Sequence, residues 1–157
     1  MPVDPALLYL VFSWGVVPFW LLLVFAPRAG FTTRLVHYGA LPMLLAAAYG
    51  LLLFTEPSAN RDSNMLSLAG VMAIFDQPQT VVAAWLHYLI FDLFIGAWEV
   101  RDAARRGVRH LFVVPCLVLT FLFGPLGLFA YLALRAVSRQ GLDLRETRES
   151  TDAPTAS

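Results

Sequence analysis

The sequence predicts an all-α integral membrane protein, built as a four-transmembrane-helix bundle with a short interfacial helix between the second and third spans. Hydrophobic residues make up 59% of the 157 residues, and charged residues only 14%. The apolar residues gather in long runs, and a helix needs about 20 of them to cross the roughly 30 Å hydrocarbon core of a bilayer. Short stretches rich in proline, glycine and arginine separate the runs, which is typical of spanning helices joined by loops.

The first predicted span covers residues 6–26 and carries aromatic side chains such as Trp14 that suit a membrane interface. The residues before it lack the basic region of a signal peptide, so we expect this run to be retained as a helix. A short loop containing Arg28 and Arg34 leads to the second predicted span, over residues 36–55.

One long connection, over residues 56–78, follows the second span. Ser63 or Asn64 can cap a short helix that ends at Phe75 and keeps its apolar side chains on one face. This helix is too short to span a bilayer. We expect it to lie at the interface over the bundle, and a re-entrant segment is the alternative.

The third predicted span covers residues 79–102, and the fourth covers residues 111–137, where prolines interrupt it. Residues 1–137 are expected to form a single transmembrane domain, and the polar tail over 138–157 is expected to be disordered. Four spans would place both termini on one side of the membrane. The arginines that follow the first span favour the outer side for both.

The third span carries the ionisable groups. His87 and Asp92 lie inside it, and Glu99 and Asp102 stand at its end. A carboxylate near the middle of a membrane helix costs roughly 2.5–3.5 kcal/mol, so it is retained where something opposite needs a carboxyl group. At about 100° per residue, all the polar groups of this helix fall within one arc of roughly 140°. We expect this polar arc to face the interior of the bundle.

Several functional classes are disfavoured. The formal net charge of zero gives no indication of a nucleic-acid partner. The single cysteine, Cys116, excludes an intrachain disulfide and a cysteine-rich metal site. Four possible metal ligands stand near one membrane face: His37, Glu99, Asp102 and His110. The closely spaced histidine and glutamate pairs of metal-binding helices are missing, so we expect neither a metal nor a cofactor.

Several short motifs occur in a specific order and spacing over residues 6–137. They are Val17-Pro18-Phe19-Trp20, Ala26-Pro27-Arg28-Ala29, Leu68-x-Gly70 with Phe75, Ala84-Trp85-Leu86-His87, Asp92-Leu93-Phe94, Asp102, Arg109-His110 and Pro125-x-Gly127. Together they resemble the abscisic-acid-deficient-4-like family. Plant members of that family are needed to make neoxanthin from violaxanthin in plastids.

The resemblance implies a membrane-embedded carotenoid-modifying protein of the neoxanthin-synthase type. Such a cofactor-free intramolecular isomerase would convert a 5,6-epoxide into an allenic alcohol, with one group protonating the epoxide oxygen and another removing a proton from the adjacent carbon. Removal from water favours the protonated carboxyl group, so Asp92 is the expected acid, and His87 is the expected base. Ala97 and Glu99 depart from the plant pattern as we know it, which points to a changed substrate.

The remaining site candidates divide into two groups. The aromatic residues expected to bind substrate are Trp85, Tyr88, Trp98 and Trp14. The expected supporting residues are Asp102, His110, His37 and Glu99. Structural alternatives stay open at this point. Asp92 can bond to a carbonyl released by a proline, His87 can bond to a neighbouring helix, and the other charges can be solvated helix ends.

A non-catalytic carotenoid- or lipid-binding subunit that assists another enzyme is the alternative function, because aromatic residues make up 13% of the chain. In both cases the expected partner is a carotenoid or another polyene lipid, with a homo-oligomer or a pigment enzyme as further partners. The chain carries no recognisable plastid-targeting segment, so we expect it in a bacterial inner or photosynthetic membrane.

Overall fold

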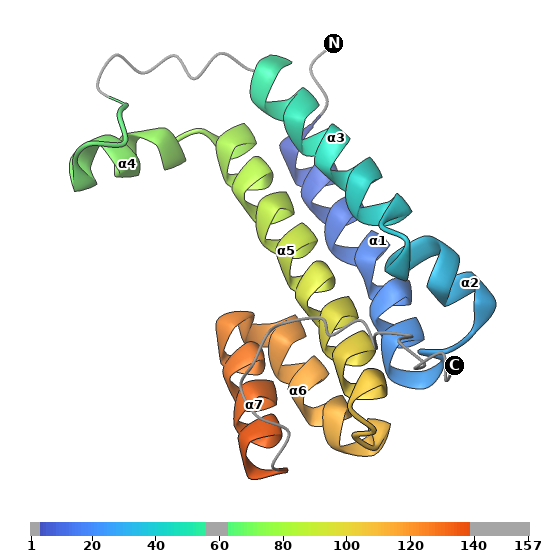
Figure 1. Ribbon diagram of the computed structural model, residues 1–157. Coiled ribbons are helices and arrows are strands. Elements are labelled where there is room, and N and C mark those ends of the chain that lie inside the picture. The colour runs from blue at the N-terminus through green and yellow to red at the C-terminus, as the bar shows by residue number, and fades with distance from the viewer. Residues whose placement is uncertain (1–3, 56–62, 139–157) are drawn as a thin grey trace, which may run out of the picture.

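The computed structural model describes residues 4–55 and 63–138, and the regular structure of this part is helical (Figure 1). Three helical stretches are long and apolar enough to cross a membrane: Pro5–Phe25, Gly30–Phe54 and Pro78–Arg105. This confirms the prediction of an all-helical membrane protein. The expected disordered tail, apart from its first residue, lies outside the described residues.

The first span is helix α1, Pro5–Phe25. Its start is fixed by Asp4, whose side chain accepts a 2.9 Å hydrogen bond from the backbone N–H of Ala6. Pro5 occupies the first turn, where the missing N–H costs nothing. The helix ends at Phe25, two residues before Pro27 and close to the predicted boundary.

The second span begins earlier than predicted. It consists of α2, Gly30–Thr32, a π-helical turn η1, Thr33–His37, and helix α3, Ala40–Thr55. The loop expected around Arg34 is therefore helical. Gly39, with a φ of 78°, joins the turn to α3, and this left-handed conformation is one that glycine adopts without strain.

Helix α5, Pro78–Arg105, is the central element of the fold, and α1, α3 and α6 all pack against it. Its contacts fix the directions of its neighbours. Trp85 bonds to Ser13 of α1, and Gly96 lies against Trp20 further along α1. His87 contacts Tyr49 of α3, and Arg101 contacts His37, which precedes α3. Helix α1 therefore runs parallel to α5, and α3 runs antiparallel to both (Figure 1).

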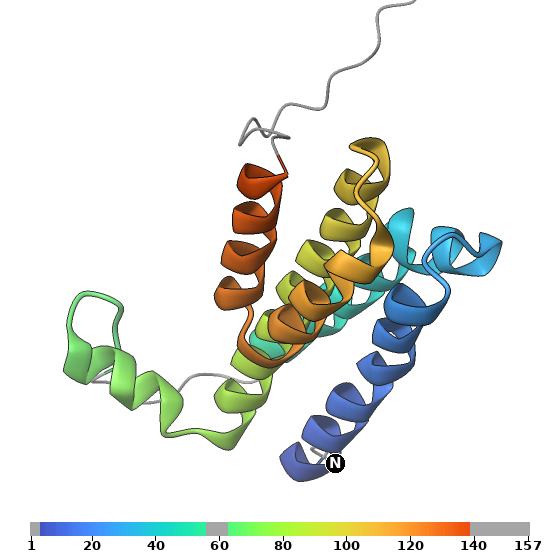
Figure 2. The same ribbon diagram turned by 90° about the horizontal axis from the view of Figure 1, so that it is seen from below.

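The last two helices form a hairpin, and the interrupted fourth span expected over 111–137 is not confirmed. Helix α6, His110–Phe123, has 14 residues and helix α7, Pro125–Val137, has 13. Each is shorter than the about 20 residues that cross a bilayer. Figures 1 and 2 show the two helices side by side, with their connection at one end.

The reversal at Gly124-Pro125 has a local cause. Gly124 adopts a φ of 46°, and Pro125 has no N–H to continue the helix. Gly127 then lets α7 approach α6, because a Cβ on Gly127 would overlap the backbone nitrogen and the hydroxyl of Thr120. The tip of the hairpin lies at Asp92 of α5, about halfway along that helix, while its two ends lie near Asp102.

Three spans followed by a hairpin give a different topology from four spans. The start of α1 and the end of α7 lie at opposite ends of α5, so this arrangement does not support the expectation that both termini share one side. All the arginines that the structure describes gather at the end where the hairpin enters: Arg28, Arg34, Arg101, Arg105, Arg106, Arg109 and Arg135.

Helix α4, Leu68–Phe75, is the short helix of the long connection. Its cap is Ser67, whose hydroxyl accepts a 3.0 Å hydrogen bond from the N–H of Gly70, and not Ser63 or Asn64 as predicted. The helix projects beyond the start of α5 and does not lie over the bundle (Figure 2). Its apolar side chains are mostly exposed, and its position relative to a bilayer interface stays a prediction.

Candidate functional site

The carboxyl groups of the polar arc are buried between α5 and the hairpin. Asp92 is 8% exposed, Glu99 0% and Asp102 4%. For these three residues the prediction that the polar arc faces the interior is confirmed. It is wrong for His87, which is exposed on the other flank of α5.

Asp92 lies directly against the tip of the hairpin. A Cβ placed on Gly124 would stand 2.7 Å from Asp92 Oδ1, so only glycine leaves room for the carboxyl group. The Tyr88 side chain, one helical turn earlier, is close enough to the Asp92 carboxyl group to interact with it. Asp92 Oδ2 is buried and has no hydrogen-bond partner among the described residues. Buried polar atoms are usually paired, so this oxygen marks Asp92 as a candidate functional group.

An aromatic cleft of about 190 Å³ lies beside this carboxyl group. Residues of α1, α5 and α6 line it: Ser13, Trp85, Tyr88, Leu89, Phe121 and Leu122. Trp85 and Tyr88 stack with their ring centroids 5.3 Å apart and their planes at 21°. The Trp85 indole N–H donates a 2.8 Å hydrogen bond to the Ser13 hydroxyl. Two of the four candidate aromatic residues therefore come together, next to Asp92.

The other two candidate aromatics lie elsewhere. Trp98 packs edge-on against Tyr131 of α7, with the ring centroids 5.5 Å apart. Trp14 is 70% exposed on the outer surface of α1. Neither residue is among those that line the cleft, so the structure does not bring them to Asp92.

His87 faces α3 and not the cleft. Its ring lies 4.6 Å from that of Phe91 and 5.6 Å from that of Tyr49. Five residues separate His87 from Asp92, which places them about 140° apart around the helix. The two sides of α5 have different neighbours, so the expected acid–base pair is not assembled by the fold.

Glu99 connects α5 to the last turn of α6. The hydroxyl of Thr120 donates a 2.9 Å hydrogen bond to Glu99 Oε1, and both side chains are fully buried. The carboxyl groups of Glu99 and Asp92 are close enough to interact electrostatically. Glu99 was expected among the supporting residues, and this contact ties the hairpin to the helix that carries Asp92.

Asp102 connects α5 to α7 through a charged cluster. It accepts a 2.7 Å hydrogen bond from the Tyr131 hydroxyl and bonds of 3.0 and 3.1 Å from Arg106 Nε. Arg135, fully buried on α7, lies 3.4 Å from the same carboxylate. The several cations and donors offset the cost of burying this charge. Asp102 therefore holds the hairpin in place.

Sequence reasoning missed the hairpin side of these contacts. Thr120, Tyr131 and Arg135 are polar residues within an otherwise apolar run, and Arg135 follows Tyr131 by one helical turn. That spacing places the two on one helix face and could have indicated a partner for the carboxylates of the third span.

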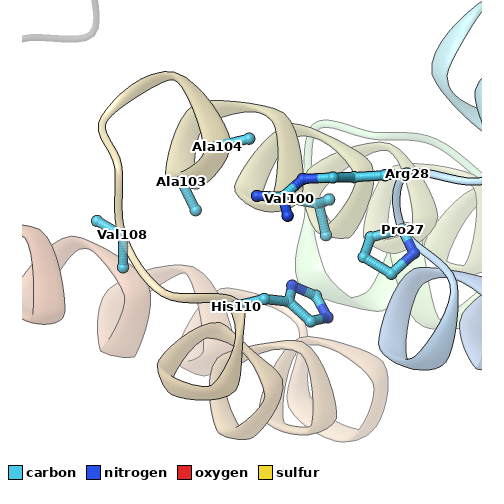
Figure 3. Close-up of a pocket in the computed structure, with 7 residues that line it drawn as sticks. All are labelled: Pro27, Arg28, Val100, Ala103, Ala104, Val108 and His110. Atoms are coloured by element: carbon cyan, nitrogen blue, oxygen red, sulfur yellow. The ribbon is translucent and has the colours of Figure 1, made fainter.

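His37 and His110 bind backbone carbonyls at the end of α1. His37 Nε2 lies 3.1 Å from the carbonyl oxygen of Pro27, and His110 Nε2 lies 2.9 Å from that of Val24. A cavity of about 20 Å³, large enough for one water molecule, lies beside His110. Figure 3 shows the Arg28 side chain reaching over Val100 above it. Both histidines join neighbouring elements to α1.

The histidines and carboxylates do not converge on one point. No group of three or more His, Cys, Asp or Glu side chains that could hold a metal ion occurs within residues 4–55 and 63–138.

Three apolar spans, a helical hairpin and a buried carboxyl group beside an aromatic cleft define a helical membrane protein with a candidate site for an apolar ligand. The family model described as ABA DEFICIENT 4-like matches residues 7–131, and the chain belongs to this family. Protein ABA DEFICIENT 4, chloroplastic, from Arabidopsis thaliana is 26% identical over 130 residues. These cover 78% of this chain but 58% of the relative, so the chain spans less than two thirds of its length. No solved structure matches the chain.

Proposed function

We propose that this protein modifies the end group of an epoxy-carotenoid, opening the epoxide to an allenic alcohol as in neoxanthin synthesis. Family membership supports a role related to neoxanthin synthesis. The observation that carries the chemistry is the position of Asp92, a buried carboxyl group in the middle of a membrane helix beside an aromatic cleft. A carboxyl group in that setting is rare and expensive, so a functional role is the default reading.

The cleft suits one end of a long apolar molecule. Its volume of about 190 Å³ is below the roughly 300–1,000 Å³ of typical ligand pockets. A ring would fill it, and the rest of the chain would lie outside. A second, apolar groove of about 480 Å³ between the starts of α1 and α5 contains Tyr9, whose ring lies 5.6 Å from that of Trp85. Tyr9 and Trp85 thus offer a continuous aromatic surface for a polyene.

Asp92 is the source of the proton that the epoxide oxygen receives. No basic side chain among the described residues forms an ion pair with it, in contrast to Asp102, which is paired with arginines. For a buried carboxyl group without a cation, the protonated form has the lower free energy. His87 is not proposed as the base, because the His87 ring contacts Tyr49 and Phe91 on the side of α3.

The proposed setting is a bacterial inner or photosynthetic membrane, which would supply the carotenoid directly from the lipid phase. The three apolar spans support a membrane location. A homo-oligomer or a carotenoid-processing enzyme is the proposed protein partner, because much of the apolar surface of α1 and α3 is exposed in the single chain.

A carotenoid-binding subunit without turnover is the second candidate. It is favoured by one observation, that Asp92 does not itself line the cleft. In that case Asp92 would only fasten the hairpin tip to α5, and the aromatic cleft would hold pigment for another enzyme.

Expression in a violaxanthin-producing host, followed by pigment chromatography, tests the proposal. The wild-type chain should yield the allenic product, and Asp92→Asn should lower its formation by ~10²-fold or more, the usual scale for a positioned acid. Asp76→Asn is the matched control, because Asp76 is an exposed carboxylate at the end of α4. Two results together would support the binding subunit instead: pigment copurifies with the wild-type chain, and Asp92→Asn forms as much product as wild type.

A further inference from the structure

Tyr88 stands between the cleft and Asp92. Its ring belongs to the lining of the cleft, whereas Asp92 does not. Its side chain is close enough to interact with the Asp92 carboxyl group, which lies one turn further along the same face of α5. Of these two residues, a molecule in the cleft therefore contacts Tyr88 and not Asp92.

Asp92 is enclosed on its remaining sides. The tip of the hairpin at Gly124 covers Oδ1, and Oδ2 is buried without a hydrogen-bond partner among the described residues. Glu99 lies two turns further along α5, is fully buried and is not among the residues that line the cleft. Tyr88 is thus a described residue that both lines the cleft and interacts with the Asp92 carboxyl group.

The Tyr88 ring is held by its neighbours. It stacks on Trp85, and Trp85 is fixed in turn by the hydrogen bond from its indole to Ser13 of α1. A ring held in this way restricts the positions that its hydroxyl can take, and efficient proton transfer requires a positioned group.

We propose that Tyr88 is the catalytic residue that exchanges protons with the substrate, and that Asp92 acts through it. This inference rests on the proposed function. The Tyr88 O–H bond breaks and its proton bonds to the epoxide oxygen, while Asp92 passes its own proton to the Tyr88 oxygen. The carbon–oxygen bond of the epoxide breaks, and its electron pair stays on the oxygen, which becomes a hydroxyl.

The second half of the reaction reverses the proton movement. The C–H bond on the adjacent polyene carbon breaks, and its electron pair forms the new carbon–carbon double bond of the allene. The released proton goes to the Tyr88 oxygen as Tyr88 returns its proton to Asp92. Both residues then regain their starting state, and the reaction consumes no further reactant.

Tyr88→Phe tests this role, because it removes the hydroxyl and keeps the ring that stacks on Trp85. We expect normal pigment binding and product formation lowered by ~10²-fold or more. Tyr38→Phe is the matched control, since Tyr38 is 79% exposed and lines neither the cleft nor the apolar groove beside it. The double variant Tyr88→Phe/Asp92→Asn should be about as slow as either single variant, because both groups serve one proton path.

An infrared measurement separates this inference from the proposed function. The carboxylic-acid band that disappears in Asp92→Asn should shift in Tyr88→Phe and stay unchanged in Tyr38→Phe, whether or not violaxanthin is the substrate. Full product formation by Tyr88→Phe, with a strong loss in Asp92→Asn, would overturn the role of Tyr88 alone. An Asp92 band at the same frequency in Tyr88→Phe and in wild type would overturn it as well. A wild type without product would refute the proposed function.

Discussion

Gly127→Ala should open the hairpin that covers Asp92. The added methyl group would meet the backbone nitrogen, the hydroxyl and the Cα of Thr120. Backbone atoms cannot rotate away as a side chain can, so α7 must move off α6. Because the Thr120 hydroxyl bonds to Glu99, the same movement strains the contact between the hairpin and α5.

Three contributions set the expected change in the free energy of hairpin opening, and the first opposes the other two. Alanine in place of glycine favours a helix by roughly 0.5–1 kcal/mol. Overpacking costs about 1–3 kcal/mol, and a weakened hydrogen bond to a buried carboxyl group costs about 0.5–1.5 kcal/mol. The free energy of hairpin opening should therefore fall by about 2 kcal/mol, which corresponds to a roughly 30-fold larger open population.

The single cysteine provides the assay. Cys116 lies on α6 and is 5% exposed, so its reaction with a thiol-specific dye in detergent micelles reports opening of the hairpin. Gly127→Ala should react about 30-fold faster than wild type, following the shift in the opening equilibrium. Gly50→Ala is the control, because its Cβ would meet no atom within 4 Å, and it should react no faster than wild type. Equal rates for Gly127→Ala and wild type would refute the packing argument.

Three further predictions follow from the fold. The described arginines lie at the end of the bundle that holds the end of α7, and cytoplasmic loops are rich in arginine, so reporter fusions should place the end of α7 in the cytoplasm and the start of α1 on the opposite side. A shared location would contradict the three-span topology. Asp102→Asn leaves the buried Arg135 without its carboxylate and should lower the free energy of unfolding in detergent by about 3–5 kcal/mol. A variant about as stable as wild type would contradict this prediction. His87→Gln should form product in the violaxanthin host within about threefold of wild type, since substitutions of exposed residues change free energies by about 0.5 kcal/mol. A ~10²-fold loss of product would instead support His87 as the base.

The sequence alone determined the class of protein and the helix that matters. Apolar runs longer than about 18 residues cannot be stably exposed to water, so the first and third spans could be placed to within a few residues. Helical periodicity also grouped Asp92, Glu99 and Asp102 on one face, because the angle between side chains depends on the backbone alone. The ordered motifs gave the family, which the match over residues 7–131 confirms.

Tertiary structure decided which groups meet. The polar arc is wide enough to touch two neighbours, and only the packing of α3 on one flank and the hairpin on the other separates His87 from Asp92. The hairpin itself depends on the conformation of Gly124, whose reversal an apolar run can hide, because a kinked span and a reversed one have the same composition. The proline–glycine signal near residue 125 was visible in the sequence. Whether the chain continues or returns at such a signal is set by what packs against it, here the contact of Gly127 with Thr120 and the ion pair of Arg135 with Asp102.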